Sequence, residues 1–228
     1  MAKIKKKKTR LRVGPVLIGI VLLSFLGCGI YYLLGMKIEN IIILGNKDVS
    51  DEKIIEEAGL ADYPSFYWTS SGSIKRKVLA DPLIEKVTVK KKFFHVIEIT
   101  VQEYKMLYKQ ASDNKVVLSD GSILMTDENI PYLPVLLNYV PDTKQEAFHE
   151  GMNNIKDDIR NQISEITYDP NDYDKDRFLL LMDDGNSVYL TLTKFDMINY
   201  YDEVLPQLEG KKGILYLDSG NHFQIMES

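Results

Sequence analysis

The stretch ENIIILGNKDVSDEKIIEEAGL, residues Glu39 to Leu60, decides the fold of the region around it. Its β-branched triplet Ile41-Ile42-Ile43 is typical of a buried strand, and Gly45-Asn46 is typical of a turn. The sequence therefore predicts a strand from Lys37 to Leu44 that ends in a tight turn.

A short helix is predicted directly after this turn. Ser50 is placed to cap its N-terminus with a side-chain oxygen, and Asp51 and Glu52 face the positive end of the helix dipole. Gly59 stands where the left-handed residue that ends a helix is expected.

An uncharged apolar run, Val13 to Met36, precedes this module. As a helix it would be roughly 36 Å long, enough to cross a hydrocarbon layer of about 30 Å. Residues 1–12 carry seven Lys and Arg and no acidic residue, so we expect a cytoplasmic basic tail, a transmembrane helix over 13–36 and an extracytoplasmic C-terminus. A cleaved signal peptide and a lipoprotein anchored at Cys28 are the alternatives, and the long uninterrupted run favours the membrane span.

Composition excludes several classes of function. The part after Met36 has 21 Lys and Arg against 33 Asp and Glu, a formal net charge of −12, which argues against nucleic-acid binding. Cys28 is the only cysteine and lies inside the apolar run, so the exported part has neither a disulfide nor a catalytic thiol.

The module continues through the aromatic loop Tyr63 to Trp68, which we expect to fill the core rather than to lie at the lipid interface. A second helix is predicted from Ser73 to Val78, and it stops before Asp81-Pro82. Two alternating strands follow, Lys86 to Lys90 and Val96 to Gln102. The expected order is β-α-α-β-β.

The rest of the chain is predicted to be a second mixed β domain with helices on one face. Asp120-Gly121 and Asp184-Gly185 are hairpin turns between apolar runs. Two helices are expected between them, and a shorter helix is expected at Phe195 to Leu205. The apolar residues that indicate the two helices recur at helical spacing: Ala147, Phe148, Met152, Ile155, Ile159, Ile163 and Ile166.

No candidate for catalysis or metal binding has a complete motif. Ser50-Asp51-Glu52-Lys53 and Ser219-Gly220-Asn221 match parts of a penicillin-binding acyl-transfer site, but the K-T-G strand that such a site needs is missing. The acidic run Asp169 to Asp176 opens like a calcium loop but has Arg177 where that loop needs glycine. His95, His149 and His222 are too dispersed for a zinc site, so we expect no cofactor and no metal. The basic patch Lys86 to Lys92 could meet lipid headgroups, anionic wall polymer or an acidic partner, and a solvated strand face without a partner is the equal alternative.

The terminal ribbon, Gly213 to Met226, has one charge, Asp218, and neither Lys nor Pro. Strands at the edge of a sheet usually carry charged residues, especially Lys, or Pro, which prevent pairing with a strand of another chain. An unguarded edge is either covered by its own chain or kept for a strand of another protein.

In their order and spacing, several of these segments resemble the FtsQ/DivIB family of bacterial cell division proteins. The segments that carry the resemblance are IENIIILGNKDVSDEKIIEEAGL, DPLIEKVTVKKKFFHVIEITVQE, LSDGSILMTD, LLLMDDGNSVYLTL and GILYLDSGNHF. The resemblance implies a POTRA domain over 37–104 and a β domain over 105–228, an α+β fold in all.

The resemblance also implies a function. Such a protein would be a bitopic, non-catalytic scaffold of the division septum that recruits FtsB/DivIC-type and FtsL-type partners, with septal peptidoglycan synthases as further partners, and helps to regulate peptidoglycan synthesis. Its family binds the FtsB/DivIC-type partner through the C-terminal sheet edge, so we expect the partner-binding residues to be Ile214, Leu215, Tyr216, Leu217, Asp218, His222, Phe223 and Ile225. The alternatives are a membrane-anchored cell-wall enzyme and a POTRA-bearing component of polypeptide transport.

Overall fold

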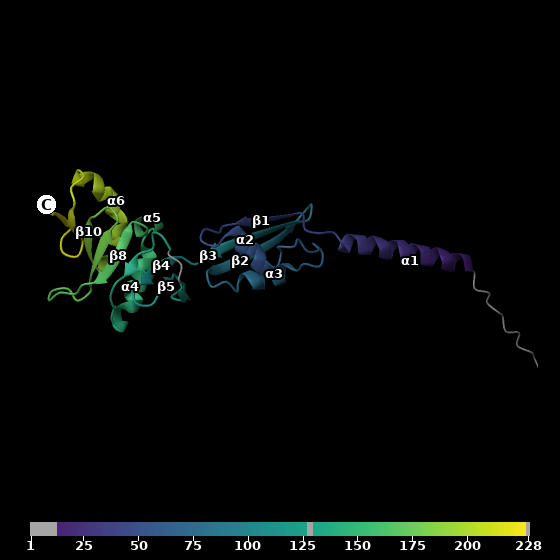
Figure 1. The fold of residues 1–228 in the computed structure, drawn as a ribbon, viewed down its shortest axis with the longest axis horizontal. Helices are drawn as coiled ribbons and strands as arrows, with labels where there is room; N and C mark the ends of the chain where they lie inside the picture. The colour runs from purple at the N-terminus through teal and green to yellow at the C-terminus, as the bar shows by residue number, and fades with distance from the viewer. Residues whose placement is uncertain (1–12, 127–129, 227–228) are drawn as a thin grey trace, which may run out of the picture. The chain divides into compact units, whose positions relative to one another are not determined.

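The computed structural model describes residues 13–126 and 130–226, so the predicted cytoplasmic tail lies outside the described residues. The chain divides into two compact units, residues 1–103 and 104–228. Figure 1 labels the main helices and strands of each.

The first unit begins with an apolar helix that is long enough to cross a membrane. The expected β-α-α-β-β order follows it and is confirmed. Its elements are α1 (Val13–Leu34), β1 (Asn40–Leu44), α2 (Asp51–Ala58), α3 (Ser71–Val78), β2 (Ile84–Lys92) and β3 (Val96–Glu103).

These three strands form a sheet in the order β1-β3-β2, in which β1 is parallel and β2 antiparallel to the central β3. Ser50 caps α2 by accepting the backbone N–H of Lys53 at 3.3 Å, and Gly59 ends it with a left-handed φ of 71°. Both caps are where the sequence places them. Ile54 and Ile97, each fully buried, join the helix to the sheet.

The aromatic loop departs from the prediction. Phe66 is buried, but Tyr67 is 47% exposed and Trp68 is 74% exposed, so the expectation that the whole cluster fills the core was wrong. The second helix starts at Ser71 rather than at Ser73.

The second unit holds one nine-stranded sheet in the described residues, in the order β12-β11-β10-β9-β8-β7-β4-β5-β6. Both predicted hairpins, β5-β6 and β9-β10, are present and antiparallel. The strands are β4 (Met106–Gln110), β5 (Lys115–Leu118), β6 (Ile123–Met125), β7 (Val135–Leu136), β8 (Ile163–Tyr168), β9 (Arg177–Met182), β10 (Ser187–Thr191), β11 (Gly213–Tyr216) and β12 (His222–Ile225).

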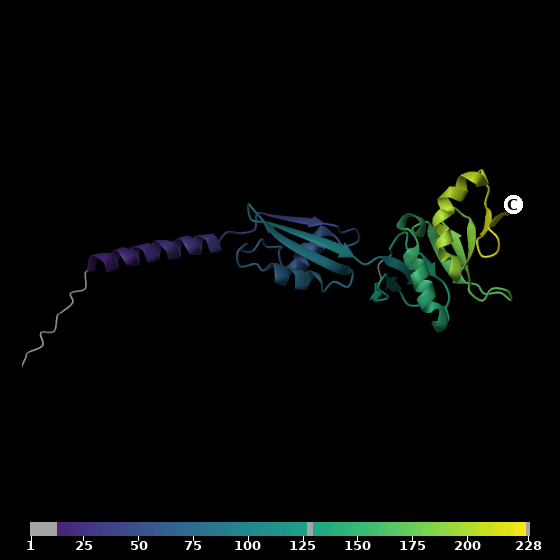
Figure 2. The same ribbon diagram turned by 180° about the vertical axis from the view of Figure 1, so that it is seen from behind.

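The helices of this unit are α4 (Asp142–Asn154), α5 (Asp157–Arg160) and α6 (Tyr201–Val204), with 3-10 helices η1 (Leu192–Tyr200) and η2 (Leu205–Leu208). Figure 2 shows α4, in teal, and the run from η1 to η2, in yellow-green, in front of the sheet, on one face of it. The expected helix at Phe195 to Leu205 is therefore a broken run of short helical turns.

The helical assignment of Ile163 and Ile166 was wrong, because both belong to β8. The pairing of β8 with β9 shifts register between Ile163 and Glu165. A bulge adds one residue to a strand, so two core-facing side chains can stand three positions apart instead of two. Ile163 and Ile166 are both buried and therefore imitate helical spacing.

The core lies between the sheet and the helices. The Phe148 ring of α4 stacks on Phe178 of β9 with centroids 4.8 Å apart, and Phe195 of η1 meets both rings edge-on. This aromatic cluster packs α4 and η1 against β9.

Candidate functional site

The C-terminal strand β12 is the edge of the large sheet. β11 pairs with β10 on one side and with β12 on the other, so it is an interior strand. Among residues 13–126 and 130–226, no strand pairs with the outer side of β12. The unpaired edge is therefore formed by residues 222–225 rather than by both strands of the ribbon.

The backbone groups of β12 divide into two sets. The N–H of Met226 donates to the carbonyl oxygen of Lys212 at 3.0 Å, which makes this pair a hydrogen-bonded one. In an antiparallel ladder, hydrogen-bonded and non-bonded pairs alternate. Gln224 and His222 therefore bond inward to β11, and the N–H and C=O groups of Phe223 and Ile225 point outward.

On the helix side of the sheet, β11 and β12 line a groove of about 440 Å³. Leu215 and Leu217 form its floor and are only 5% and 6% exposed, whereas Phe223 is half-buried and Ile225 is 49% exposed. Tyr201, Val204 and Leu208 line the groove from the helical side. An apolar side chain that follows the edge of β12 could lie in this groove.

The opposite face carries a row of stacked planar side chains that crosses four strands. The Arg177 guanidinium carbon lies 3.4 Å from the ring centroid of Tyr189. Tyr189 stacks on Tyr216 with centroids 5.4 Å apart, and Tyr216 stacks on His222 at 4.6 Å. Tyr216 is thus covered on both ring faces, and the row ends at the exposed His222 on the edge strand.

The Asp218 carboxylate pairs with a basic side chain of the same protein. Its side chain is 7% exposed, and its Oδ2 accepts a hydrogen bond from Arg177 Nε at 3.0 Å. The same guanidinium donates through Nη1 to Asp169 at 3.2 Å. A carboxylate paired and buried in this way anchors the β11-β12 turn to β9 instead of facing a partner.

A buried amide that the sequence analysis missed holds β11 in place. Asn186, 2% exposed, donates to Asp184 Oδ2 at 2.9 Å and contacts the Tyr201 hydroxyl at 3.0 Å. Its Oδ1 accepts the N–H of Gly213, the first residue of β11, at 3.0 Å. Burial and the neighbouring Asp184 carboxylate raise the pKa of Tyr201, so this hydroxyl stays protonated.

The eight residues expected to bind a partner therefore fall into three groups. Leu215 and Leu217 are buried, and Asp218 is half-buried with its carboxylate paired to Arg177, so binding of a partner by these three residues stays a prediction. Ile214 and Tyr216 are half-buried on the face of the stacked row, and His222, Phe223 and Ile225 belong to the edge strand. Gln224 and Met226, both exposed at the same edge, were missed because only the register shows that they share it.

The fragments of catalytic and metal motifs serve local structure. Ser50 caps a helix, and the Ser219 hydroxyl lies 3.0 Å from Asp218 Oδ1. In the acidic turn, Asp174 Oδ1 accepts the N–H of Asp176, whose carboxylate pairs with Lys144. In the part of the chain that the structure describes, no three His, Cys, Asp or Glu side chains form a possible metal site.

Comparison with known proteins gives matches to both units. The model of the FtsQ-type POTRA domain matches residues 36–104, and the model of the C-terminal domain of cell division protein FtsQ/DivIB matches residues 106–219. Cell division protein DivIB of Listeria monocytogenes is 29% identical over 228 residues, which covers 96% of this chain and 84% of that protein. DivIB of Bacillus subtilis is 27% identical over 196 residues, covering 82% of this chain and 74% of the relative.

One solved structure, the major extracytoplasmic domain of the trans isomer of DivIB from Geobacillus stearothermophilus, matches with a TM-score of 0.40 at 21% identity. That match covers 47% of this chain and 96% of the solved one.

Proposed function

Because this chain belongs to the FtsQ/DivIB family of cell division proteins, we propose that it is a membrane-anchored, non-catalytic scaffold whose strand β12 accepts a strand from a partner. The family places the chain in cell division. The proposal adds how it takes part: by binding rather than by chemistry.

The observation that carries the proposal is the outward row of backbone groups on β12. The N–H and C=O groups of Phe223 and Ile225 have no strand beside them in the described residues. The edge also carries neither proline nor lysine, the residues that usually prevent such pairing. A partner strand would satisfy these groups through backbone bonds, and its alternate side chains would enter the groove beside Leu217.

The proposed partners are bitopic division proteins of the FtsB/DivIC and FtsL types at the septum, through which the scaffold would act on septal peptidoglycan synthases. We place the N-terminus in the cytoplasm, because basic residues precede α1. Anchoring in the same bilayer raises the effective concentration of the sheet edge near the juxtamembrane segments of such partners.

Substitution of Ile225 by proline tests the strand addition. Proline removes the outward N–H of residue 225 and leaves the inward bonds of Gln224 intact, and edge strands accept proline at such positions. The full chain with Ile225→Pro should lose co-purification with its DivIC-type partner and keep its thermal unfolding temperature.

Ile225→Ala is the matched control, because it shortens the same side chain and keeps the N–H group. It should bind more weakly than the wild type but more strongly than the proline variant. Equal binding by the alanine and proline variants would show that no backbone bond is made at this residue, and the strand addition would be rejected.

A further inference from the structure

The part of the chain that matches the POTRA domain, residues 36–104, is called the POTRA unit, and one end of it exposes three large aromatic side chains. Phe93 is 91% exposed, Phe94 is 83% exposed and Trp68 is 74% exposed. Single apolar residues on a protein surface are ordinary, but several together mark a contact with a partner or a membrane. We call these three residues the aromatic tip.

The tip joins two segments that are far apart in sequence. Phe93 and Phe94 belong to the turn between β2 and β3, whereas Trp68 belongs to the loop before α3. Lys91 Nζ lies 4.7 Å above the ring of Phe66 and donates to its carbonyl oxygen.

His95 completes this junction. Its ring meets Phe66 edge-on with centroids 5.2 Å apart and Tyr67 with centroids 5.9 Å apart. The loop and the turn therefore pack against each other at the same end of the sheet.

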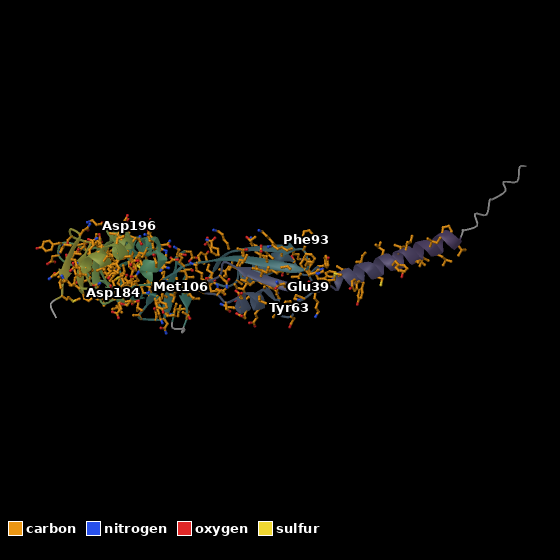
Figure 3. The ribbon with its side chains drawn as sticks, turned by 90° about the horizontal axis from the view of Figure 1, so that it is seen from above. Glu39, Tyr63, Phe93, Met106, Asp184 and Asp196 are labelled. Carbon is orange, nitrogen blue, oxygen red and sulfur yellow. The ribbon has the colours of Figure 1, made fainter. Side chains whose placement is uncertain are left out.

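The chain holds this end close to the apolar helix. The N–H of Phe66 donates to the carbonyl oxygen of Met36 at 2.9 Å, and the N–H of Glu39 donates to that of His95 at 3.0 Å. Met36 stands two residues after the end of α1, a span of at most about 7 Å of extended chain. In Figure 3, Phe93 and Glu39 are labelled at the same end of the POTRA unit. The tip is thus tethered within a short distance of the point where α1 ends.

The backbone of the turn is unfavourable for the residues that it carries. Lys92 pairs with Val96, so the turn has three residues, and Phe94 and His95 adopt left-handed φ angles of 61° and 53°. Glycine or asparagine occupies such positions at lower cost than a bulky ring. The Phe94 ring gains little burial within the fold in return, which points to a contact outside the chain.

We propose that the aromatic tip inserts into the headgroup region of the bilayer that α1 crosses, and so fixes the POTRA unit against the membrane surface. Tryptophan and phenylalanine favour this interface, and the exposed Lys90 near the turn suits anionic headgroups. Glu98 pairs with Lys92, and Glu39 faces His95 at 3.4 Å, so the nearby carboxylates are engaged within the unit.

Trp68 makes the test specific, because it is the only tryptophan in the chain. The full chain would be reconstituted in discs of equal parts phosphatidylcholine and phosphatidylglycerol, with and without bromine on the upper acyl chain. We expect blue-shifted Trp68 emission, strong quenching by the brominated lipid and weak quenching by iodide in solution.

Phe94→Asn separates the membrane contact from folding. Asparagine relieves the left-handed strain, so the variant should be at least as stable as the wild type, yet its quenching by brominated lipid should fall. Tyr173→Asn is the matched control, because Tyr173 is fully exposed in the other unit and its loss should leave Trp68 emission unchanged.

Emission typical of indole in water, with iodide quenching and no effect of brominated lipid, would overturn the proposal. A blue shift that appears only when a second division protein is present would also overturn it and would assign the tip to a protein partner. The strand addition at β12 is independent of this outcome, since Ile225→Pro should quench like the wild type.

Discussion

Glu57, a half-buried carboxyl in α2, contributes to the pH dependence of the POTRA unit. The side chain of its neighbour Asp81 is fully buried, and Lys53 Nζ lies 2.6 Å from Asp81 Oδ2 and 3.8 Å from Glu57 Oε1. Burial, and then the Asp81 charge, raise the pKa of Glu57 above its ordinary value of 4.5. Ionised Glu57 is therefore less favourable in the folded than in the unfolded chain.

The difference in the pKa of Glu57 between the folded and the unfolded chain determines how stability changes with pH. The stability that Glu57 contributes is fully present below pH 4.5 and is lost as the pH rises through the raised pKa of the folded protein. Glu57→Gln should therefore raise the unfolding temperature of the POTRA unit at neutral pH, and the gain should shrink as the pH falls below 4.5. Trp68 fluorescence reports the unfolding of this unit alone.

The exposed neighbour Glu56 provides the control on the same helix. Glu56→Gln should leave the unfolding temperature nearly unchanged at both pH values. A Glu57→Gln variant whose stability relative to the wild type does not depend on pH would contradict the assignment.

Residue-level predictions from sequence succeeded where the partners are local. Ser50 and Gly59 cap a helix through groups three or four residues away, so their roles can be deduced from the sequence nearby. Asn186 and Asp218 bond to groups 15 to 41 residues away, Tyr201, Gly213 and Arg177. Only the folded sheet brings those groups together, so the sequence alone could not show that Asp218 pairs with Arg177 or that Asn186 holds the start of β11.

At the scale of elements, α4 packs against η1 at its glycine. A Cβ atom on Gly151 would lie 2.9 Å from Cγ and 3.0 Å from Cδ1 of Phe195. Phe195 is 2% exposed and is held edge-on against Phe148 and Phe178, so it has little room to move. Glycine is therefore required here by packing.

Gly151→Ala should destabilise the second unit. Alanine favours a helix by about 1 kcal/mol, but overpacking of a core typically costs about 1–3 kcal/mol, so the net effect should be a loss. Denaturant unfolding followed by near-UV circular dichroism measures it.

Gly72→Ala in α3 is the comparison substitution. Gly72 is exposed and its Cβ would meet only Ser70 Oγ, at 3.7 Å, so this variant should gain stability. If Gly151→Ala stabilises its unit as Gly72→Ala does, the prediction that Phe195 leaves no room for a Cβ atom at residue 151 is wrong.

The hairpins and the β-α-α-β-β order could be predicted because turn dipeptides and alternation are local signals. The strand β8 could not, because the bulge between Ile163 and Glu165 gives its buried residues a helix-like spacing. The order of strands was also beyond the sequence pattern, since β10 and β11 pair in parallel across the intervening helical run. That pairing places β11 inside the sheet and leaves β12 at its edge.

At the scale of the whole molecule, the chain combines a long apolar helix with an open sheet edge. α1 is long and apolar enough to cross a bilayer, and the second unit ends its sheet at β12. If α1 anchors the chain as proposed, it would raise the effective concentration of this edge near a partner in the same bilayer. A strand of four residues offers a small binding area, and the higher effective concentration would compensate for it.

Backbone hydrogen exchange in β12 tests this account most directly. The amide of Gln224 points inward and serves as an internal reference, whereas the amides of Phe223 and Ile225 point outward. Exchange would be followed by NMR on the full chain alone and with the proposed DivIC-type partner. The account predicts that the amides of Phe223 and Ile225 exchange rapidly in the free chain and become strongly protected in the complex. Unchanged, rapid exchange of both amides in a saturated complex would contradict it.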